Sequence, residues 1–498
     1  KGLTTYVQVR FVQMRQYSIG KRLIEGYLHQ PYSWFLNRNS SNLGKTILSE
    51  VQQVVGGGLS PFMDLIAKGV VALSIIILLI IINPKIALIV SLVISLAYGI
   101  IFYFTRRYLN RNGEERLKNN QLRFTAVSEA FGAAKEVKVG GLEETYTRRF
   151  SNATQIIARN LAATASISQL PRFFLEALAF GGILLLMLYL MMQSGSFNSV
   201  LPIISLYIFA GYRLMPALQH IYSSSSQLIA IGPSVNELYE DLRNLKPIIS
   251  DQDQGILPLN KSIIIKNVDY NYPNTSRTAL KNINIIIDAK TTVGLVGTTG
   301  SGKTTTVDII LGLLEPQKGS LEIDGKIISK KNTRSWQRSI GYVPQHIYLS
   351  DDTIEANIAF GEKTADVNKE RVENASKIAN LHKFIIEELP KKYQTVIGER
   401  GVRLSGGQRQ RIGIARALYY NPNVLVLDEA TSALDNQTEK AVMDAVLNLH
   451  KDITIILIAH RLNTVKNCDI IFKLEKGQLV GQGTFEELIN GNKKFTTI

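Results

Sequence analysis

One stretch decides the fold of the C-terminal half of the chain: Gly297-Thr298-Thr299-Gly300-Ser301-Gly302-Lys303-Thr304. It matches the phosphate-binding pattern G-x-x-x-x-G-K-S/T, follows an apolar run at 293–296 and precedes another at 307–314. Glycines let the backbone curl so that successive N–H groups face phosphate oxygens, and the helix that follows adds its positive N-terminal end. We therefore expect a nucleotide-binding α/β domain. Lys303 would neutralise phosphate charge and the Thr304 hydroxyl would bind Mg²⁺, while the rest of the stretch and Thr305 also contact the nucleotide.

Two adjacent acidic residues end a second apolar run, Val424-Leu425-Val426-Leu427-Asp428-Glu429. Neighbouring side chains of a strand point to opposite faces, so one carboxylate can hold a metal ion while the next faces the attacking water. We expect Asp428 to be a Mg²⁺ ligand and Glu429 to be the general base. An acidic strand end without a catalytic role is common, but the phosphate-binding stretch in the same chain favours the catalytic interpretation.

The segment Leu404-Ser405-Gly406-Gly407-Gln408 precedes an expected helix at 409–418. Together with the two elements above, it resembles the signature of the ATP-binding-cassette (ABC) ATPases. In that family, the serine and the glycines close over the γ-phosphate of ATP bound by the other subunit. The resemblance therefore implies ATP as the nucleotide and a dimer as the working unit, and we expect a second copy of the same chain as the partner.

Further positions match the same family pattern. The resemblance makes Tyr272 the aromatic residue that stacks on adenine, although an aromatic before proline is also typical of plain packing. Gln345 matches the glutamine that joins Mg²⁺ and the attacking water to the membrane domain. His460 matches the histidine that contacts the γ-phosphate, and Asp435 matches the loop that crosses the dimer interface. The segment 398–401, Gly-Glu-Arg-Gly, resembles a cross-subunit element of the exporters of this family.

The N-terminal half contains long apolar segments of the kind that cross a bilayer, which takes about 20 residues per helix. We expect four crossings, near 64–82, 86–104, 174–192 and 199–222. Short turns join them into two hairpins, so the polar parts of the chain lie on one side of the membrane. Between Arg106 and Arg159 there are eleven basic and six acidic residues. This basic excess places that side in the cytoplasm.

The expected architecture is an α-helical transmembrane domain followed by an α/β P-loop NTPase domain of the ABC type. Its parts are a transmembrane domain at 1–244, a polar linker at 245–262 and a nucleotide-binding domain at 263–498. The membrane half resembles that of exporters, in which six helices cross the membrane. Residues 1–30 match the cytoplasmic end of the second of these helices. We therefore expect the first two crossings to be missing from this sequence. Residues 31–44 and 129–140 resemble the two loops that couple membrane and ATPase domains.

Overall charge and cysteine content exclude other classes. The net charge is +15, but nothing in the sequence resembles a base-stacking or groove-reading module, so we expect the membrane and not nucleic acid to be the partner. The single cysteine, Cys468, allows no intrachain disulfide. The resemblance places the chain in the inner (cytoplasmic) membrane as an ATPase that drives transport.

Two arginines at the membrane edges bear on the cargo. Arg172 and Arg213 lie beside apolar segments, where a charge is costly and usually faces a cavity or a partner. Both side chains could instead reach the interface, or Arg172 could pair with Glu176. The functional interpretation is that they bind an anionic phosphate or pyrophosphate head group, because their surroundings are similar to those in bacterial flippases of lipid-linked oligosaccharides. Two alternatives are a peptide or multidrug exporter and a non-transporting membrane ABC ATPase.

Overall fold

The computed structural model describes residues 2–491, apart from 195–196, 247–254, 274, 276–277, 399–400, 430–435, 448, 450–451 and 460–461. The chain forms two compact units. One comprises 1–30 and 38–248, and the other comprises 31–37 and 249–498. The short segment 31–37 thus belongs with the C-terminal half, although the chain on both sides of it belongs to the N-terminal half.

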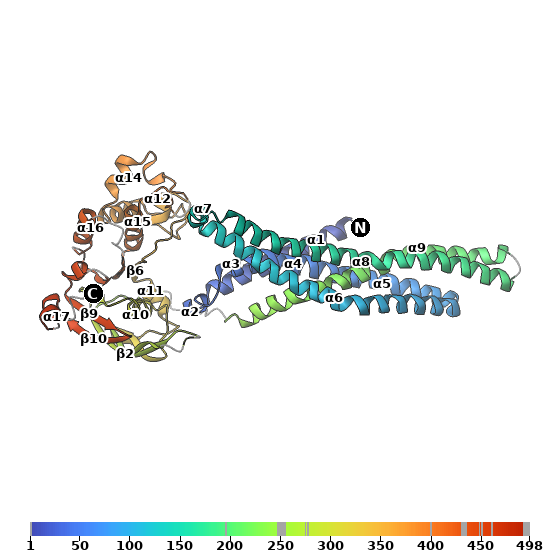
Figure 1. The fold of residues 1–498 in the computed structure, drawn as a ribbon, viewed down its shortest axis with the longest axis horizontal. Coiled ribbons are helices and arrows are strands. Elements are labelled where there is room, and N and C mark those ends of the chain that lie inside the picture. Colours follow the sequence, from blue (N-terminus) through green and yellow to red (C-terminus); the bar gives the residue numbers. More distant parts are fainter. Residues whose placement is uncertain are drawn as a thin grey trace. The chain divides into compact units, whose positions relative to one another are not determined.

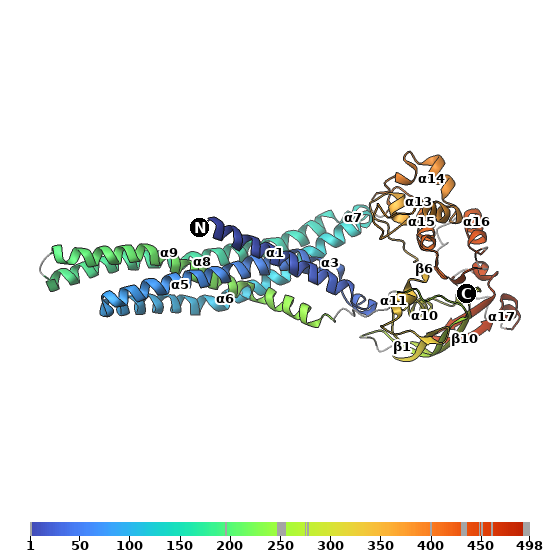
Figure 2. The same ribbon diagram turned by 180° about the vertical axis from the view of Figure 1, so that it is seen from behind.

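Long helices build the first unit, and in both views α5, α6, α8 and α9 run lengthwise beside one another (Figures 1 and 2). The helix bounds are α1 Gly2–Leu28, α3 Ser40–Lys45, α4 Val51–Val54, α5 Ser60–Ile82, α6 Pro84–Gly132, α7 Ala134–Val139, α8 Glu143–Ser194 and α9 Phe197–Asn244. The four expected crossings lie on α5, α6, α8 and α9. In the described part of the chain, two continuous helices, 40–82 and 84–132, are long and apolar enough to cross a membrane.

Local chemistry explains where these helices turn. The Asn83 side chain caps α6 by accepting a hydrogen bond from the backbone N–H of Ile86 at 3.3 Å, and Pro84 stands at the start of the helix, where a missing N–H costs nothing. At the other end, α6 stops at Gly132 and α7 is followed by a turn in which Gly141 has a φ of +61°. A residue with a side chain is disfavoured at such a φ. The short turn expected between the first two crossings is found.

One helix of the first unit departs from regular α geometry. The chain from Ser40 to Ile82 is continuously helical, but it contains two π-helical turns, η1 Thr46–Glu50 and η2 Val55–Leu59. A π turn adds a residue to the turn and therefore rotates the side chains that follow it relative to those before it. No feature of the sequence predicted these turns.

The second unit contains two sheets. Its strands are β1 Ser262–Asn271, β2 Thr278–Asp288, β3 Thr292–Val296, β4 Lys318–Ile323, β5 Lys326–Ile327, β6 Ile340–Val343, β7 Val424–Asp428, β8 Thr454–Ile458, β9 Ile470–Glu475 and β10 Gln478–Gly483. An antiparallel sheet has the order β2-β1-β4-β5, and a second sheet has the order β10-β9-β3-β8-β7-β6. In the second sheet the strands β9, β3, β8, β7 and β6 are parallel to one another. Ligands of such sheets bind beyond the carboxyl ends of the strands.

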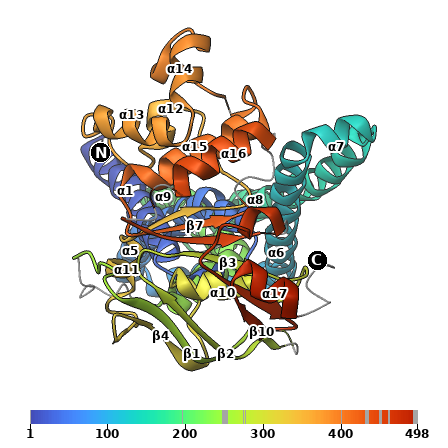
Figure 3. The same cartoon turned by 90° about the vertical axis from the view of Figure 1, so that its left-hand side faces the viewer.

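Helices cover both faces of the parallel sheet, with α10 between it and the antiparallel sheet and α15 and α16 on the opposite face (Figure 3). The helix bounds in this unit are α2 Tyr32–Phe35, α10 Lys303–Ile310, α11 Thr333–Gln337, α12 Ile354–Ile358, α13 Lys369–Ile378, α14 His382–Glu388, α15 Gly406–Tyr419, α16 Asn436–Leu447 and α17 Phe485–Gly491. Isoleucine, leucine and valine side chains fill the two layers. The all-buried strands β3 and β7 carry the expected site residues to one edge of the sheet.

Candidate functional site

The loop between β3 and α10 has a backbone that only glycine accommodates at two points. A Cβ added to Gly297 would lie 2.2 Å from the carbonyl oxygen of Leu474, and one added to Gly302 would lie 2.7 Å from Cδ2 of Leu280. Gly302 also has a φ of +104° and directly precedes α10. The tight curl expected of a phosphate-binding loop is therefore present, with Thr298, Thr299 and Gly300 on its exposed side.

Lys303 closes the base of this loop. Its Nζ donates to the carbonyl oxygens of Gly297 at 2.7 Å and Thr298 at 3.2 Å, and the side chain is buried. Burial lowers the pKa of Lys303, while the carboxylates of Glu429 and Asp428 act in the opposite direction. The ammonium is thus held at the loop by weak neutral acceptors that an anionic group would replace.

A buried hydroxyl in the loop lacks a hydrogen-bond partner. Ser301 is buried, and among the described residues its Oγ accepts or donates no hydrogen bond. Buried polar groups are almost always paired, so an unpaired one indicates a missing partner. In this loop the partner with suitable chemistry is a phosphate oxygen.

The carboxylates expected at the end of β7 lie beside the glutamine expected to work with them. Gln345 Nε2 donates to Glu429 Oε2 at 2.9 Å, across the ends of β6 and β7. Asp428 is buried, whereas Glu429 has a φ of +49°. Non-glycine residues in this region are strained, and such strain often occurs at functional sites. The left-handed backbone at Glu429 directs its carboxylate toward Gln345 instead of continuing the strand.

An acidic residue that the sequence analysis did not single out lies close to Asp428. Asp308 is buried on α10, five residues after Lys303. Burial, followed by the negative charge of Asp428, raises the pKa of Asp308 from 3.8 to about 6. The signal was available, because Asp308 is the only charged residue within the apolar run 307–314.

Asp308→Asn is expected to stabilise the nucleotide-free protein at neutral pH. Because the folded-state pKa of about 6 exceeds the unfolded value of 3.8, protonation of Asp308 favours folding fully below the lower value, and this contribution is lost as the pH rises through the higher one. Asparagine keeps the uncharged form at every pH. After a discount for solvent screening, we expect a gain of roughly 1–2 kcal/mol, or about 2–6 °C in melting temperature, at pH 7.5.

A thermal melt without nucleotide measures this effect, and the gain should nearly vanish at pH 4. The exposed Asp366→Asn is the matched control and should change nothing. An Asp308→Asn gain of the same size at both pH values would contradict the assigned cause.

The expected adenine-stacking residue is anchored to the helix after the loop. The hydroxyl of Tyr272 and Oγ1 of Thr305 are 3.0 Å apart, and the ring of Tyr272 meets that of Tyr270 edge-on at 5.2 Å. The ring is half-buried, so part of its surface remains accessible. The role of Tyr272 in stacking stays a prediction.

The expected signature forms the start of α15. Ser405 caps the helix, because its Oγ accepts from the N–H of Gln408 at 3.2 Å and Oε1 of Gln408 accepts from the N–H of Ser405 at 2.8 Å. This reciprocal cap starts the helix at Gly406, three residues earlier than the sequence analysis placed it. Gly406 and Gly407 therefore lie in the first helical turn, where backbone N–H groups are free of intrahelical partners.

Some expected site residues lie outside the described residues. These are His460, Asp435 and the Glu399-Arg400 pair of the segment 398–401. Their roles remain predictions.

Comparison with known proteins identifies the family. A model described as ABC transporter matches residues 280–432, and one described as ABC transporter transmembrane region matches residues 2–248. A protein of Cupriavidus pinatubonensis named ATP-dependent lipid A-core flippase is 31% identical over 477 residues, which cover 95% of this chain and 80% of that protein. The chain belongs to the ABC transporter family. The family inferred from the sequence motifs is thereby confirmed.

Further similarities extend over nearly the whole ABC transporter. A protein of Escherichia coli, also named ATP-dependent lipid A-core flippase, is 29% identical over 98% of this chain and 84% of that protein. A solved structure of a bacterial Atm1-family ABC exporter with ATP bound has a TM-score of 0.86 over 100% of this chain, at 24% sequence identity. The expected fold, a helical exporter domain fused to an ABC ATPase domain, is confirmed. The protein is an ABC half-transporter of the cytoplasmic membrane that uses ATP to drive transport, with its ATPase domain in the cytoplasm.

The site of this ABC transporter fits ATP and Mg²⁺. The curled loop, the buried Lys303 and the unpaired Ser301 Oγ suit phosphate oxygens. Mg²⁺ prefers oxygen ligands and usually keeps water and phosphate oxygens among them, so few side chains are needed. The Thr304 hydroxyl, the Asp428 carboxylate and the Gln345 amide oxygen have the chemistry of such ligands, and their roles stay predictions.

Proposed function

We propose that this transporter moves a lipid-linked oligosaccharide, or a related lipid with a phosphate or pyrophosphate head group, across the cytoplasmic membrane. The observation that carries the proposal is the placement of Arg172 and Arg213 on the helices of the expected second hairpin, α8 and α9. A guanidinium in an apolar segment is costly unless it meets an anion, and it bonds phosphate in a bidentate manner.

The contacts of Arg172 support an anion-binding role. Its Nε donates to Oε1 of Glu176 at 2.8 Å, one helical turn further along α8, and about half of each side chain remains exposed, 53% and 48%. The pair therefore neutralises the arginine without burying it. A head-group phosphate can displace the carboxylate, because the exchange leaves the guanidinium paired throughout. Arg213 is also exposed.

The relatives support a lipid cargo, since the similar proteins of Cupriavidus pinatubonensis and Escherichia coli are named as flippases of lipid A-core. A peptide or multidrug exporter is the second candidate, because such proteins use the same ATPase. A non-transporting membrane ABC ATPase is the third, and the fused exporter-type membrane domain argues against it.

We further propose that the transporter works as a homodimer with two ATP sites. Each site joins the loop 297–304, Tyr272 and Thr305 of one chain to the signature 405–408 of the other, because one chain carries only one copy of each. Asp428, Thr304 and Gln345 would hold Mg²⁺, which would shield phosphate charge when bound. Glu429 accepts the proton of the attacking water, and His460 contacts the γ-phosphate.

Arg172→Ala and Arg213→Ala test the cargo. In proteoliposomes with a polyprenyl-pyrophosphate-linked oligosaccharide, each is expected to lower flipping about 10- to 100-fold, the value of a hydrogen-bonded charge pair. Basal ATPase activity should stay unchanged, because neither residue belongs to the ATP site. Arg159→Ala on α8 and Arg243→Ala on α9 are matched controls on the cytoplasmic parts of the same helices.

Unaltered flipping in both variants would refute the head-group role. If the lipid neither stimulates the ATPase nor moves, and labelled peptides or drugs accumulate in the same vesicles, the second candidate replaces the first.

A further inference from the structure

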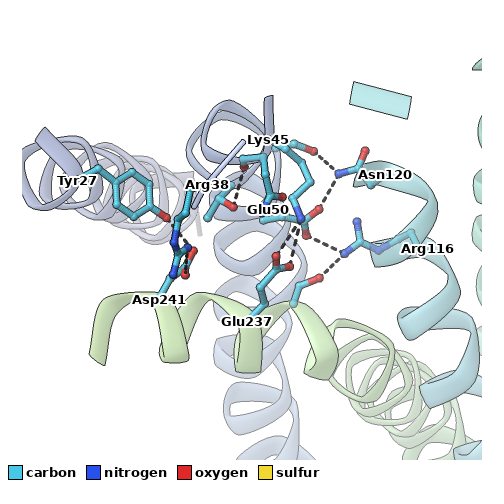
Figure 4. A network of polar contacts seen from close by, with 12 residues as sticks. Tyr27, Arg38, Lys45, Glu50, Arg116, Asn120, Glu237 and Asp241 are labelled. Atoms are coloured by element: carbon cyan, nitrogen blue, oxygen red, sulfur yellow. Dashed lines mark hydrogen bonds and ion pairs between the residues drawn. The ribbon is translucent and has the colours of Figure 1, made fainter. Parts of the chain in front are cut away.

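Three residues on one face of α9 make polar contacts with the segments packed around this helix. Ser234, Glu237 and Asp241 are spaced i, i+3 and i+7, so they share one side of the helix. Each of the three makes a hydrogen bond or an ion pair to a residue of another segment (Figure 4). In the sequence, α9 is the last helix before the ATPase domain. The three residues therefore lie near the point where the chain leaves the membrane domain.

Asp241 joins both ends of the segment 31–37. Its Oδ2 accepts a hydrogen bond from the hydroxyl of Tyr27 at 2.8 Å, and its Oδ1 accepts from Nη1 of Arg38 at 3.0 Å. Tyr27 precedes the segment and Arg38 follows it. Burial and the nearby Asp241 raise the pKa of Tyr27, so the phenol stays protonated and remains a donor. A single carboxylate on α9 thus closes the base of the loop that carries α2.

The segment 31–37 belongs to the compact unit of the ATPase domain. Within that unit, burial and the charge of Asp308 raise the pKa of Tyr32, the first residue of α2. Asp308 lies on the helix that follows the phosphate-binding loop. The segment between the two anchors of Asp241 is therefore part of the ATPase unit, and its Tyr32 lies within reach of the charge on Asp308.

Glu237 and Ser234 continue the attachment further along α9. Lys45 Nζ, which is fully buried, donates to Glu237 Oε1 at 2.9 Å. Nη2 of Arg116, on α6, donates to Ser234 Oγ and lies 3.1 Å from Oε2 of Glu50. Lys45, Glu50 and Arg116 are buried and cannot exchange their partners for water without a large penalty, so the helices that carry them move together.

The π turn η1 explains how one helix supplies both Lys45 and Glu50. In a regular α-helix, residues five apart are rotated by roughly 140° and face different sides. The π turn Thr46–Glu50 lies between them and reduces this rotation, because each of its turns takes more residues. Lys45 then reaches α9, while Glu50 reaches both Arg116 and, at 2.6 Å, Nδ2 of Asn120 on α6.

We propose that Asp241 is a positioning residue that couples the ATPase cycle to the membrane helices. By holding Tyr27 and Arg38 at once, it makes the segment 31–37 and α9 move as one body. The pairs Lys45–Glu237 and Glu50–Arg116 pass that movement to α6. Without Asp241 the loop can follow the ATPase domain while α9 stays behind, so ATP is consumed without movement of the membrane part.

Hydrogen–deuterium exchange of the full-length protein in nanodiscs tests this without a transport substrate. We compare exchange with and without Mg²⁺, ATP and vanadate, in peptides that cover 297–305 and 205–222. In Asp241→Ala, the nucleotide-induced change at 205–222 should shrink about threefold or more. Protection of 297–305 and the ATPase rate should remain as in the wild type, a split that a merely misfolded variant would not show.

Glu240→Ala is the matched control, since this neighbour on α9 is exposed and pairs only loosely with Arg243, at 4.0 Å. Tyr27→Phe removes the hydroxyl that donates to Asp241, with little risk to folding. The nucleotide-induced change in exchange at 205–222 should shrink in this variant too, but less than in Asp241→Ala. The double variant Arg38→Asp with Asp241→Arg swaps the two charges and should restore the nucleotide-induced change in exchange at 205–222. The proposal would be overturned if the nucleotide-induced change in exchange at 205–222 were as large as in the wild type in both Asp241→Ala and Tyr27→Phe.

Discussion

Glu429→Gln is expected to lower the steady-state ATPase rate about 100-fold or more, the usual contribution of a positioned general base. The glutamine keeps the shape of the side chain but cannot take a proton from water. The hydrogen bond from Gln345 Nε2 to Oε2 of Glu429, at 2.9 Å, can be replaced by one to the amide oxygen, so the site should stay assembled. ATP should then bind, close the two chains over it and remain uncleaved.

Phosphate release gives the rate, and ATP retained through gel filtration reports the trapped complex. Glu475→Gln is the matched control, because Glu475 is an exposed acid at the end of β9, a neighbour of β3 in the same sheet. Rapid hydrolysis by Glu429→Gln would overturn the role assigned to Glu429, whereas slow hydrolysis without retained ATP would point to lost binding.

Lys303→Met should abolish ATP binding at ordinary concentrations. Among the residues that the structure describes, the buried ammonium donates to two loop carbonyls, at 2.7 and 3.2 Å, and an ATP phosphate would offer it charged acceptors instead. Hydrogen bonds to charged groups contribute about 1.5–3 kcal/mol each, so the loss of two corresponds to roughly 100-fold or more in affinity. Methionine fills a similar volume and packs in the same place, so the protein should still fold without ATP.

Equilibrium dialysis with labelled ATP measures the affinity, and a thermal melt of the same sample establishes folding. Lys281→Met, at an exposed lysine of β2, is the control. Binding of ATP to Lys303→Met with an affinity within about twofold of the wild type would contradict the assignment.

Several elements of the ATPase domain could be predicted from the sequence. The apolar run 293–296 before the phosphate-binding loop lies in β3 Thr292–Val296, and the acidic strand end is β7 Val424–Asp428. Both were predictable because a buried parallel strand is a short apolar run with defined ends. The start of α15 was placed three residues late, since two glycines are poor helix formers and the decisive cap depends on the reciprocal bonding of Ser405 and Gln408.

Other features depend on contacts that no local pattern encodes. The left-handed backbone of Glu429 arises where β7 ends and its N–H meets the carbonyl oxygen of Ile458 at 3.2 Å. The raised pKa of Asp308 comes from burial and from Asp428, 120 residues away in sequence. The π turn Thr46–Glu50 has no signature in its own sequence, and its last residue, Glu50, bonds Arg116 and Asn120 on α6.

The sequence by itself determined the ATPase, its family and the membrane-spanning character of the first half. Phosphate binding needs contiguous backbone N–H groups, and a membrane crossing needs contiguous apolar residues, so both can be recognised in short windows. Only the tertiary structure decided which residues join α9 to the segments around it. Tyr27 and Asp241 are 214 positions apart, and their pairing follows from how α1 and α9 pack, because a hydrogen bond depends on distance in space and not on distance along the chain.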